Sequence, residues 1–349
     1  MIVKVLDSSL EKQYDDYLPG SPETLLFASN KYRKFLKSFL NEEDVYFVAL
    51  DEQGEIKGVL PAFLKKNNEF GNVLNSLPFY GSNGGIIEFE QNETVRDLLV
   101  NEFYKFAEKN NCVSSTIISS PLEPMEEFYE RTTSYTCKDS RIGQLTPLPQ
   151  LTDDIDGAVM KTIHYKTRNL VRKAQKLEIN VGDGPDETYL DFLIQTHQEN
   201  LAAIGGIAKP EHFFRLIPSH FNYGSDYKIY VAKKDGQVIA ALLVFYFNKT
   251  VEYYTPVIKA EFRNSQPMSL LIFEAMKDAV ANGFTWWNWG GTWATQGGVY
   301  HFKSQWGTQD KMYYYYTKIT DSSILNRTKE QLLKEYPYFF VAPFNLVVN

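Results

Sequence analysis

The sequence predicts an α/β protein built from two similar lobes, and three features lead to this prediction. Two apolar strand pairs, each closed by a glycine turn, occupy residues 45–64 and 228–247. Each pair precedes an amphipathic helix, at residues 92–111 and 265–283, and each helix leads into a further apolar strand. The repeat distance of about 182 residues is too long for a solenoid. We therefore expect a duplicated α/β (α+β) domain, with lobes over residues 1–145 and 146–349.

Each expected element follows from a local pattern. In both strand pairs apolar residues recur in alternation, and Gly54 or Gly236 supplies the positive φ that a short turn requires. The two amphipathic helices keep apolar residues at positions i, i+3, i+4 and i+7. They run into the strands "VSSTIISS" and "FTWWNWGG". Ordinary helices are expected at residues 186–201 and 210–220.

Residues 160–178 predict a basic helix that opens the second lobe. No acidic residue occurs from 160 to 177, although the chain as a whole has a net charge of −7. Arg168 and Arg172 are four residues apart and share a face, so they could hold one phosphate group together. The alternative is a solvated helix face. The pattern also predicts one apolar stripe, formed by Leu170, Val171, Ala174 and Leu177.

Composition argues against several classes of function. The net charge of −7 disfavours a general nucleic-acid coat, although it leaves room for a local basic groove. Cys112, Cys137 and the five scattered histidines have no metal-binding spacing. The N-terminus lacks the apolar core of a signal peptide, and no apolar run approaches the ~20 residues that span a bilayer. We expect a cytoplasmic protein with no integral membrane segment, no metal and no DNA partner.

Two glycine-containing stretches are candidate ligand sites. In "LPFYGSNGGIIEF", residues 77–89, Gly84 and Gly85 would let the backbone approach a ligand and expose N–H groups. The alternative is a plain turn before a strand. In "WWNWGGTW", Gly290 and Gly291 would open a gap at the tip of a strand. There the alternative is a bend packed by core tryptophans, and strand alternation would put Trp287 and Trp289 on the same face.

Lys303 is a single cation within the aromatic and glycine-rich run "GGVYHFKSQWG". It could be a surface lysine whose stem lies over Trp306. It could also be an electrophilic clamp that stabilises an oxyanion or binds phosphate. In an extended stretch Phe302 would point to the opposite side, and Trp289, Tyr254 and Trp306 would line the groove. No nucleophile motif occurs, so an enzyme would bring two substrates together directly.

Four segments, taken in order, resemble one family: "TLLFASNKYRKFL", "SLPFYGSNGG", "HYKTRNLVRKAQK", and "WNWGGT" followed by "GVYHFKSQWG". They are similar to the FemABX-type transferases and their acetyltransferase-like relatives in polysaccharide gene neighbourhoods. The resemblance covers nearly the whole chain. It implies two tandem lobes of the GNAT acetyltransferase fold with a cleft between them. It also implies transfer of an acyl or aminoacyl group to an amine.

The resemblance implies roles for particular residues. In the peptidoglycan branch the donor is aminoacyl-tRNA, and the acceptor is a cell-wall precursor that carries a muramyl pentapeptide. Phe302 and Lys303 match a Phe–Lys pair at that branch's active site, where the lysine is thought to stabilise the oxyanion. Arg168 matches a basic position that contacts the precursor's diphosphate. The glycine loop with Tyr80 matches the substrate groove.

The chain departs from the family pattern in two places. The long helical hairpin that some members insert in the second lobe is absent. The stretch "FRNSQPMSLLIFEAM" lacks the glycines of the pyrophosphate loop in acetyl-CoA enzymes, which counts against acetyl-CoA as the donor. Ser265, Gln266 and Ser269 could still cap a helix N-terminus that meets an anion.

The leading expectation is a cytoplasmic acyl- or aminoacyltransferase that forms an amide on a phosphate-bearing cell-envelope precursor. The precursor would be a small molecule or would be linked to a lipid or nucleotide. No tightly bound cofactor is expected, since the donor would be aminoacyl-tRNA or acyl-CoA. One alternative is an acyl-CoA-dependent N-acetyltransferase of exopolysaccharide biosynthesis. The other is a non-catalytic carbohydrate-binding protein with the same fold.

The expected catalytic residue is Lys303. The group that takes the amine's proton is left open between Glu252, Asp310, the acceptor's own carboxylate and the leaving hydroxyl. The expected substrate-binding residues are Tyr80, Gly84, Gly85, Arg168, Arg172, Tyr254, Trp289, Gly290, Gly291 and Phe302.

Overall fold

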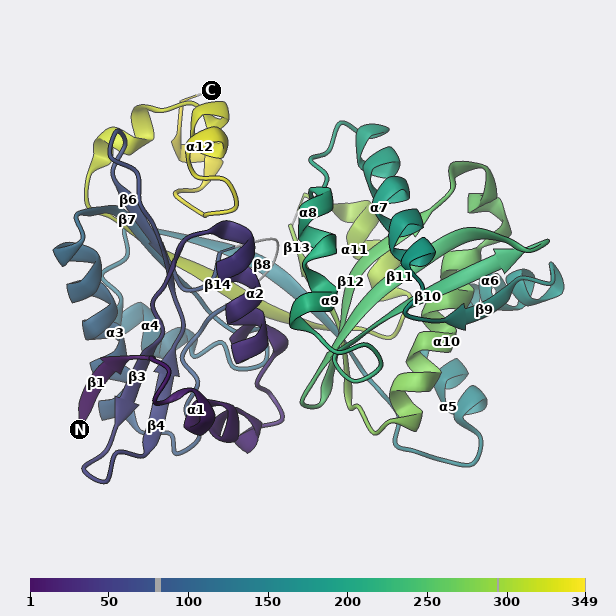
Figure 1. Cartoon of the computed structure of the whole chain (residues 1–349), viewed down its shortest axis with the longest axis horizontal. Helices are drawn as coiled ribbons and strands as arrows, with labels where there is room; N and C mark the ends of the chain where they lie inside the picture. The colour runs from purple at the N-terminus through teal and green to yellow at the C-terminus, as the bar shows by residue number, and fades with distance from the viewer. Residues whose placement is uncertain (79–82, 294, 349) are drawn as a thin grey trace. The chain divides into compact units, whose positions relative to one another are not determined.

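The computed structural model describes residues 1–78, 83–293 and 295–348, which divide into two compact units (Figure 1). The first unit comprises Met1–Ile142 and Lys311–Asn349, and the second comprises Gly143–Asp310. The chain passes from the first to the second within β8 and returns at the start of β14. The sequence pattern leaves residues 311–349 in the second lobe. In the structure they belong to the first unit, because β14 pairs with β7.

The first unit contains two sheets. One is antiparallel with the order β1-β3-β4, and the strands of the other follow the order β2-β5-β6-β7-β14-β8. Its helices and strands are β1 (Ile2–Val5), α1 (Glu11–Tyr17), α2 (Asn30–Leu40), β2 (Glu43–Asp44), β3 (Phe47–Leu50), β4 (Ile56–Leu60), β5 (Phe63–Lys65), β6 (Asn72–Asn75), α3 (Glu93–Lys109), β7 (Cys112–Ile118), α4 (Glu126–Thr132), β8 (Cys137–Pro147), β14 (Gln309–Ile319) and α12 (Lys329–Glu335).

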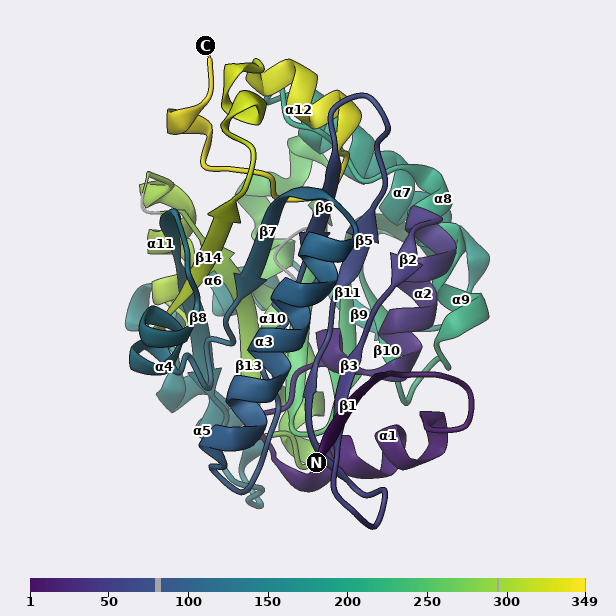
Figure 2. The same cartoon turned by 90° about the vertical axis from the view of Figure 1, so that its left-hand side faces the viewer.

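The core of the first unit lies between α3 and the strands that α3 covers (Figure 2). Asn92 caps α3, since its side chain accepts a hydrogen bond from the Val95 N–H. Leu99 and Phe103 of α3 are fully buried with Phe47 of β3. α3 joins β6 to β7, and these two strands pair in parallel, as a crossover helix allows.

The second unit has the strand order β13-β12-β11-β10-β9, with the end of β8 beside β13. Its helices and strands are α5 (Ile155–Thr162), α6 (Tyr165–Lys176), β9 (Asn180–Asp183), α7 (Glu187–Ala202), α8 (Glu211–Arg215), α9 (Ile217–His220), β10 (Tyr227–Lys234), β11 (Gln237–Phe247), β12 (Thr250–Ile258), α10 (Pro267–Ala281), β13 (Trp286–Thr292) and α11 (Gly297–Ser304).

Helices cover both faces of the central strands in the second unit, with α7 and α10 on opposite sides of β10–β12 (Figure 1). On the α10 side, Leu271 and Met276 pack with Val244 of β11 and Trp287 of β13. α10 joins β12 to β13, which pair in parallel. The mixed α/β class that the sequence predicts is therefore confirmed.

Both expected repeats of hairpin, helix and strand are present, one in each unit. Gly54 and Gly236 turn between antiparallel strands with φ of 83° and 79°. α3 and α10 lie within the predicted ranges 92–111 and 265–283. The predicted helix at 210–220 is two short helices, α8 and α9, and Pro218 stands in the first turn of the second.

The basic segment differs from the expected single helix. The chain turns between α5 and α6, where Ile163 and His164 are extended and the His164 ring accepts a hydrogen bond from the Lys166 N–H. The predicted apolar stripe is wrong at two positions, since Leu170 and Leu177 are each 37% exposed. The buried face of α6 consists of Thr167, Val171 and Ala174, because only this i, i+4, i+7 row meets the core.

Two kinds of feature are absent from the described residues. None of the helices that they form has the length and apolar character to cross a bilayer. No group of three or more His, Cys, Asp or Glu side chains among them is arranged to hold a metal ion.

Candidate active site

The candidate active site lies in the second unit, where two parallel strands diverge. β12 and β13 pair from Thr250–Trp286 to Glu252–Asn288. Both strands continue beyond this point, to Ile258 and Thr292, but the described chain shows no further pairing between them. Backbone N–H and C=O groups on the facing edges therefore lack each other as partners. We call this opening the β12–β13 fork.

A chain of hydrogen bonds crosses the base of the fork. Asn288 donates from Nδ2 to Glu252 Oε2 over 2.8 Å, and its Oδ1 accepts from the Gly290 N–H over 2.9 Å. Gly290 has a φ of 72°, which favours glycine. Its carbonyl oxygen lies 3.4 Å from Lys303 Nζ. The chain therefore connects a carboxyl group on β12 to an ammonium group on α11.

Glu252 is a buried acid with one free oxygen. The side chain is 3% exposed, and Oε1 has no hydrogen-bond partner among the described residues. Burial raises the pKa of Glu252 to about 8, although the bond from Asn288 opposes this change. The carboxyl group is therefore mostly protonated at neutral pH. The other candidate proton acceptor, Asp310, is exposed and accepts a hydrogen bond from Tyr300.

Lys303 is buried against oxygen atoms of β13. The residue is 7% exposed, and Nζ lies 2.9 Å from Thr292 Oγ1, 3.3 Å from the Gly291 carbonyl oxygen and 3.4 Å from that of Gly290. No carboxylate lies within 4.0 Å of it in the part of the chain that the structure describes. Burial accordingly lowers the pKa of Lys303 to about 8. The site holds a positive charge that no fixed negative charge compensates.

The stretch around Lys303 is the helix α11, so the extended conformation under which Phe302 would alternate with Lys303 is not present. Consecutive helical residues are rotated by about 100°, which still separates Phe302 from Lys303. Phe302 is 40% exposed while Lys303 is buried. Phe302 of α11 and Trp306, two residues beyond its end, both contact the Trp289 ring of β13.

The aromatic side chains near Lys303 differ in part from the predicted set. Trp289 contacts Trp306 at 5.7 Å and Tyr253 at 4.8 Å between ring centroids. Tyr254 instead stacks on Phe213 of α8 and meets Phe245 of β11. Strand alternation sends Tyr253 and Tyr254 to opposite faces of β12. The structure therefore groups Tyr253, and not Tyr254, with Trp289 and Trp306.

Trp289 is held from two sides and lies mostly in the core. Its Nε1 donates to Thr146 Oγ1 over 2.9 Å, and the same hydroxyl donates to the Trp306 carbonyl oxygen over 3.0 Å. The predicted pairing of Trp287 and Trp289 on one face agrees with their ring contact at 5.9 Å. The tryptophans thus exclude water from one side of the fork.

Arg168 and Arg172 lie on α6, which packs on α10. Arg168 is half-buried and Arg172 is exposed. Neither forms an ion pair with a described carboxylate, and Arg172 reaches only Asn169 Oδ1, at 3.4 Å. Both guanidinium groups are therefore available to an anion.

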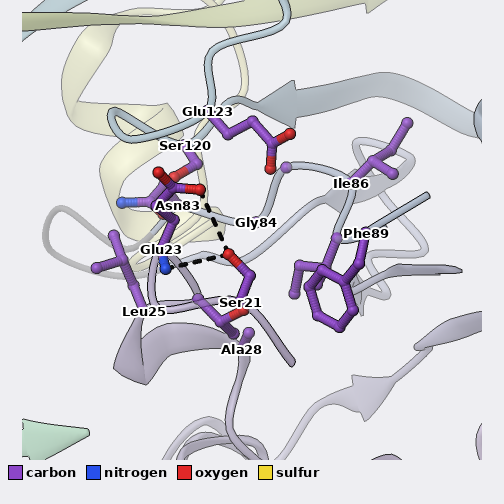
Figure 3. A pocket seen from close by; sticks show the side chains of 13 residues that line it. Ser21, Glu23, Leu25, Ala28, Asn83, Gly84, Ile86, Phe89, Ser120 and Glu123 are labelled. Carbon is purple, nitrogen blue, oxygen red and sulfur yellow. Dashed lines mark hydrogen bonds between the residues drawn. The ribbon is translucent and has the colours of Figure 1, made fainter. Parts of the chain in front are cut away.

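The glycine loop lies in the first unit and borders a pocket of about 30 Å³ (Figure 3). Tyr80 lies outside the described residues. A Cβ on Gly84 would stand 1.8 Å from the Ser76 carbonyl oxygen, and the Gly84 N–H bonds the Ile118 carbonyl oxygen. Close packing of protein backbone, which the sequence alone could not reveal, thus accounts for this glycine. Gly85 also borders the pocket, and a Cβ there would stand 3.0 Å from the Ser120 nitrogen.

The pocket at the glycine loop is acidic. Glu23 and Glu123 both border it, and Ser21 donates a hydrogen bond to Glu23 (Figure 3). Burial, followed by the nearby Glu23 carboxylate, raises the pKa of Glu123. Such a pocket disfavours an anion and suits a positively charged or hydrogen-bond-donating group.

Several polar groups of the second unit could not be predicted from sequence motifs. Asn288 and Thr292 carry the hydrogen bonds of the fork, yet no motif marks them. Lys209 lies 5.3 Å from the Tyr254 ring centroid, and burial lowers its pKa to about 8. The Lys209 N–H donates to His197 Nε2, and burial, with a smaller effect of Lys209, lowers the pKa of His197 to about 4. These residues come from different elements of the unit, and spacing along the chain cannot show that they meet.

Comparison with known proteins gives one domain match and several structures of the same fold. Residues 158–304 match a family model described as an acetyltransferase (GNAT) domain. A search of curated proteins gave no match. The structure of FemX superposes with a TM-score of 0.74 at 14% identity and covers 90% of this chain and 97% of its own.

Two further solved structures share the fold at lower similarity. L-PGS from Bacillus licheniformis has a TM-score of 0.57 at 13% identity, covering 95% of this chain and 96% of its own. The C-terminal domain of a putative lysylphosphatidylglycerol synthetase from Agrobacterium fabrum has a TM-score of 0.56 at 11% identity, covering 93% and 96%. The predicted resemblance therefore holds in two respects: residues 158–304 match an acetyltransferase (GNAT) domain, and the chain shares the fold of FemX.

Proposed function

We propose that this acyltransferase is cytoplasmic and transfers an acyl or aminoacyl group to an amine on a phosphate-bearing cell-envelope precursor. The observation that carries the proposal is Lys303, a buried ammonium with no carboxylate partner among the described residues, beside the β12–β13 fork. A preorganised positive charge in a water-poor site stabilises a developing oxyanion far more than it would in bulk solvent.

In the proposed reaction the acceptor amine attacks the carbonyl carbon of the donor ester or thioester. The new carbon–nitrogen bond replaces the bond from that carbon to the donor's oxygen or sulfur, and the tRNA hydroxyl or the CoA thiol leaves with a proton. The carbonyl oxygen becomes an oxyanion and takes a hydrogen bond from Lys303 Nζ. The longer contacts to the Gly290 and Gly291 carbonyl oxygens, at 3.4 and 3.3 Å, are the ones that yield to it. The bond to Thr292 Oγ1, at 2.9 Å, keeps the ammonium in place.

Glu252 is the proposed acceptor of the amine's proton. Its free Oε1 lies at the base of the fork, and its pKa of about 8 suits a general base that works best in mildly alkaline solution, near pH 8. Asn288 holds the other oxygen and so fixes the orientation of the carboxyl group.

Arg168 and Arg172 are proposed to bind the phosphate of the acceptor, since both lack carboxylate partners among the described residues. The acidic pocket at Gly84 and Gly85, taken by itself, suits a hydrogen-bond donor group such as an amine or amide. Phe302, with its partly exposed ring, is proposed to bind the apolar part of a substrate.

The second candidate is an acyl-CoA-dependent N-acetyltransferase, which the match of residues 158–304 to an acetyltransferase domain favours. In this version the start of α10 would meet the donor's phosphates. There Gln266 and Ser269 bond each other, Pro267 removes one N–H group, and no side chain caps the helix. The donor site would therefore depend on the remaining N–H groups of the first turn.

The first test is a thermal-shift screen with acetyl-CoA, UDP-linked muramyl pentapeptide and simple amino sugars. A ligand that binds only the folded state raises the midpoint by mass action. A shift with acetyl-CoA supports the acetyl donor, and a shift with the pentapeptide supports the cell-wall acceptor. A shift with the amino sugars alone, and no transfer in any donor–acceptor pair, would support a carbohydrate-binding protein instead.

The second test is Lys303→Met, which keeps most of the side-chain length and removes the charge. We expect the transfer rate to fall by about 10²–10³-fold, the usual effect of removing one oxyanion donor. The unfolding midpoint should not fall, because the variant no longer buries a charge. Near-full turnover in Lys303→Met would contradict the role of Lys303.

A further inference from the structure

A second cavity lies in the first unit and shares no residue with the β12–β13 fork. It has a volume of about 720 Å³ and opens between α3, β7 and β14, which lie together in Figure 2. This volume is within the range of small-molecule sites, about 300–1,000 Å³. Its polar lining includes Asn101, Tyr104 and Lys105 of α3, Ser115 of β7, and Lys318 of β14. We call this space the α3–β14 cavity.

The first feature of the cavity that indicates a ligand is the buried hydroxyl group of Ser115. Ser115 is 1% exposed, and its Oγ makes no hydrogen bond with any described residue. Its neighbours on β7 are satisfied, since Ser114 bonds the Val341 carbonyl oxygen and Thr116 bonds Thr317. A buried hydroxyl without a partner is costly, and native proteins rarely leave one so. Ser115 borders the cavity, so a bound molecule would supply the missing bond.

Lys318 provides a charge that is not balanced. It is the cross-strand partner of Ser115, and its Nζ lies 5.0 Å from the Tyr104 ring centroid. It is half-buried, and no carboxylate lies within 4.0 Å of Nζ among the described residues. Lys138 in the same unit also lies over a tyrosine, but it pairs with both Glu126 and Glu130. Lys318, unlike Lys138, therefore has no described carboxylate beside its ammonium group and could bind the anionic group of a ligand.

The rest of the cavity wall mixes apolar side chains with several polar groups. Asn101 and Ser134 are exposed there and make no hydrogen bond with described residues. Lys105 adds a second cation, 3.9 Å from Glu102. Of the two carboxylates at the cavity, Asp321 already accepts from the Ser323 N–H and Glu108 is exposed. Hydroxyl, amide and ammonium groups together fit a ligand that is itself rich in hydroxyl groups and carries one negative group.

We propose that the α3–β14 cavity binds a small polyhydroxylated molecule that bears one oxyanion group, either a phosphate or a carboxylate. The oxyanion accepts from Lys318, and a ligand hydroxyl bonds Ser115. This site does not depend on the proposed acyl transfer, since none of its residues takes part in that chemistry.

The test measures binding of D-glucose 6-phosphate, D-glucuronate and D-glucose to the full-length protein by calorimetry. The first two probes separate a phosphate from a carboxylate source, and the third lacks the charge. We expect one charged sugar to bind and D-glucose not to bind. No binding of either charged sugar at about 10 mM, which would put Kd above the range of weak metabolite sites, overturns the proposal.

Variants then locate the site. Lys318→Met should weaken binding at least about tenfold, as expected for loss of a charged hydrogen bond. Lys311→Met is the matched control on the same strand, outside the cavity, and should bind as the wild type does. Ser115→Ala should weaken binding without lowering the unfolding midpoint, because it removes a hydroxyl that has no partner among the described residues. Equal affinity in the wild type and Lys318→Met, or loss of binding in Arg168→Ala instead, would overturn the assignment.

Discussion

Lys303 and Glu252 titrate in the same pH range, and this has a consequence for the rate of transfer. Lys303 must be protonated to stabilise an oxyanion, so its contribution is lost as the pH rises through about 8. Glu252 must be ionised to take a proton, so its contribution grows as the pH approaches about 8. We expect a bell-shaped profile of kcat/KM with its maximum near pH 8.

Two variants separate the limbs of this profile. Lys303→Arg stays protonated throughout, so the fall on the alkaline side should move to higher pH. Glu252→Gln cannot ionise, so the rise on the acidic side should vanish along with most of the rate. A profile that stays flat from pH 6.5 to 9 in the wild type would contradict both assignments.

Glu252 should also make stability depend on pH. Its pKa in the folded protein is about 8, against about 4.3 in an unfolded chain. Between these values the folded state retains a proton that the unfolded state loses, so the free energy of unfolding falls as the pH rises. Glu252→Gln should flatten this dependence between pH 5 and 8. The check is urea unfolding at several pH values, with Asp310→Asn as an exposed control that should keep the wild-type slope.

Some residues of the candidate site can be predicted from the sequence, and others cannot. Lys303 stands out in the sequence because a cation among aromatic residues is unusual, and the structure places it in a buried polar niche. No comparable sequence pattern singles out Asn288. Its role depends on pairing across two parallel strands and on the left-handed φ of Gly290. Strand alternation separates Tyr253 from Tyr254 but does not say which face of β12 meets Trp289, so the sequence cannot decide between them.

At the scale of elements, α6 is the part whose function depends on its neighbours. Its charge pattern predicts an exposed basic ridge, and Arg168 and Arg172 indeed lack carboxylate partners among the described residues. The predicted apolar stripe is too wide because α6 buries only a narrow row against α10. Pattern analysis gives the period of a helix but not the width of the face that its partner covers.

We expect Arg168→Ala to weaken binding of a phosphate-bearing acceptor by about 1.5–3 kcal/mol, the range for a charged hydrogen bond. Lys166→Ala, on the exposed side of the same helix, is the control and should bind normally. Titration of UDP-linked muramyl pentapeptide into each variant measures the difference. Equal affinity in both variants would mean that Arg168 is solvated and does not bind the acceptor.

Gly84 and Gly54 of the first unit should respond differently to the same substitution. A Cβ on Gly84 would overlap the Ser76 carbonyl oxygen at 1.8 Å, whereas a Cβ on Gly54 would meet nothing within 4 Å. We expect Gly84→Ala to reduce the free energy of unfolding by about 3 kcal/mol or more, as overpacking against backbone does. Gly54→Ala carries only the strain of a left-handed φ, about 1–2 kcal/mol. Similar losses in denaturant unfolding would contradict the packing role of Gly84.

At the scale of the whole molecule, the duplication is readable from the sequence but the path of the chain is not. The repeated order of hairpin, helix and strand appears in each unit, since local periodicity determines it. The return of residues 311–349 to the first unit depends on pairing between β14 and β7, about 200 residues apart along the chain. Single-sequence patterns hold no signal for such a distant partner.

Because residues 311–349 belong to the first unit, we expect the C-terminal segment to stabilise that unit and not the second. The Ser114 hydroxyl bonds the Val341 carbonyl oxygen, the Asn75 side chain bonds both backbone groups of Phe340, and Tyr336 bonds the Gly71 carbonyl oxygen. Removing residues 321–349 would leave the Ser114 hydroxyl and the Asn75 Oδ1 without these partners, which costs about 1–3 kcal/mol for each group, while the Asn75 Nδ2 would keep its bond to the Leu74 carbonyl oxygen.

Hydrogen exchange can resolve this effect by unit, because amide protection reports local opening. In the truncated chain we expect faster exchange in β6 and β7 and unchanged exchange in β10–β12, where no residue contacts the deleted segment through the bonds named above. A truncation after Lys334, which keeps Ile324 and most of α12 but still removes Phe340 and Val341, should show nearly the same pattern. Uniform loss of protection in both units would mean that the units unfold as one, and full protection in β7 would mean that the C-terminal bonds contribute nothing.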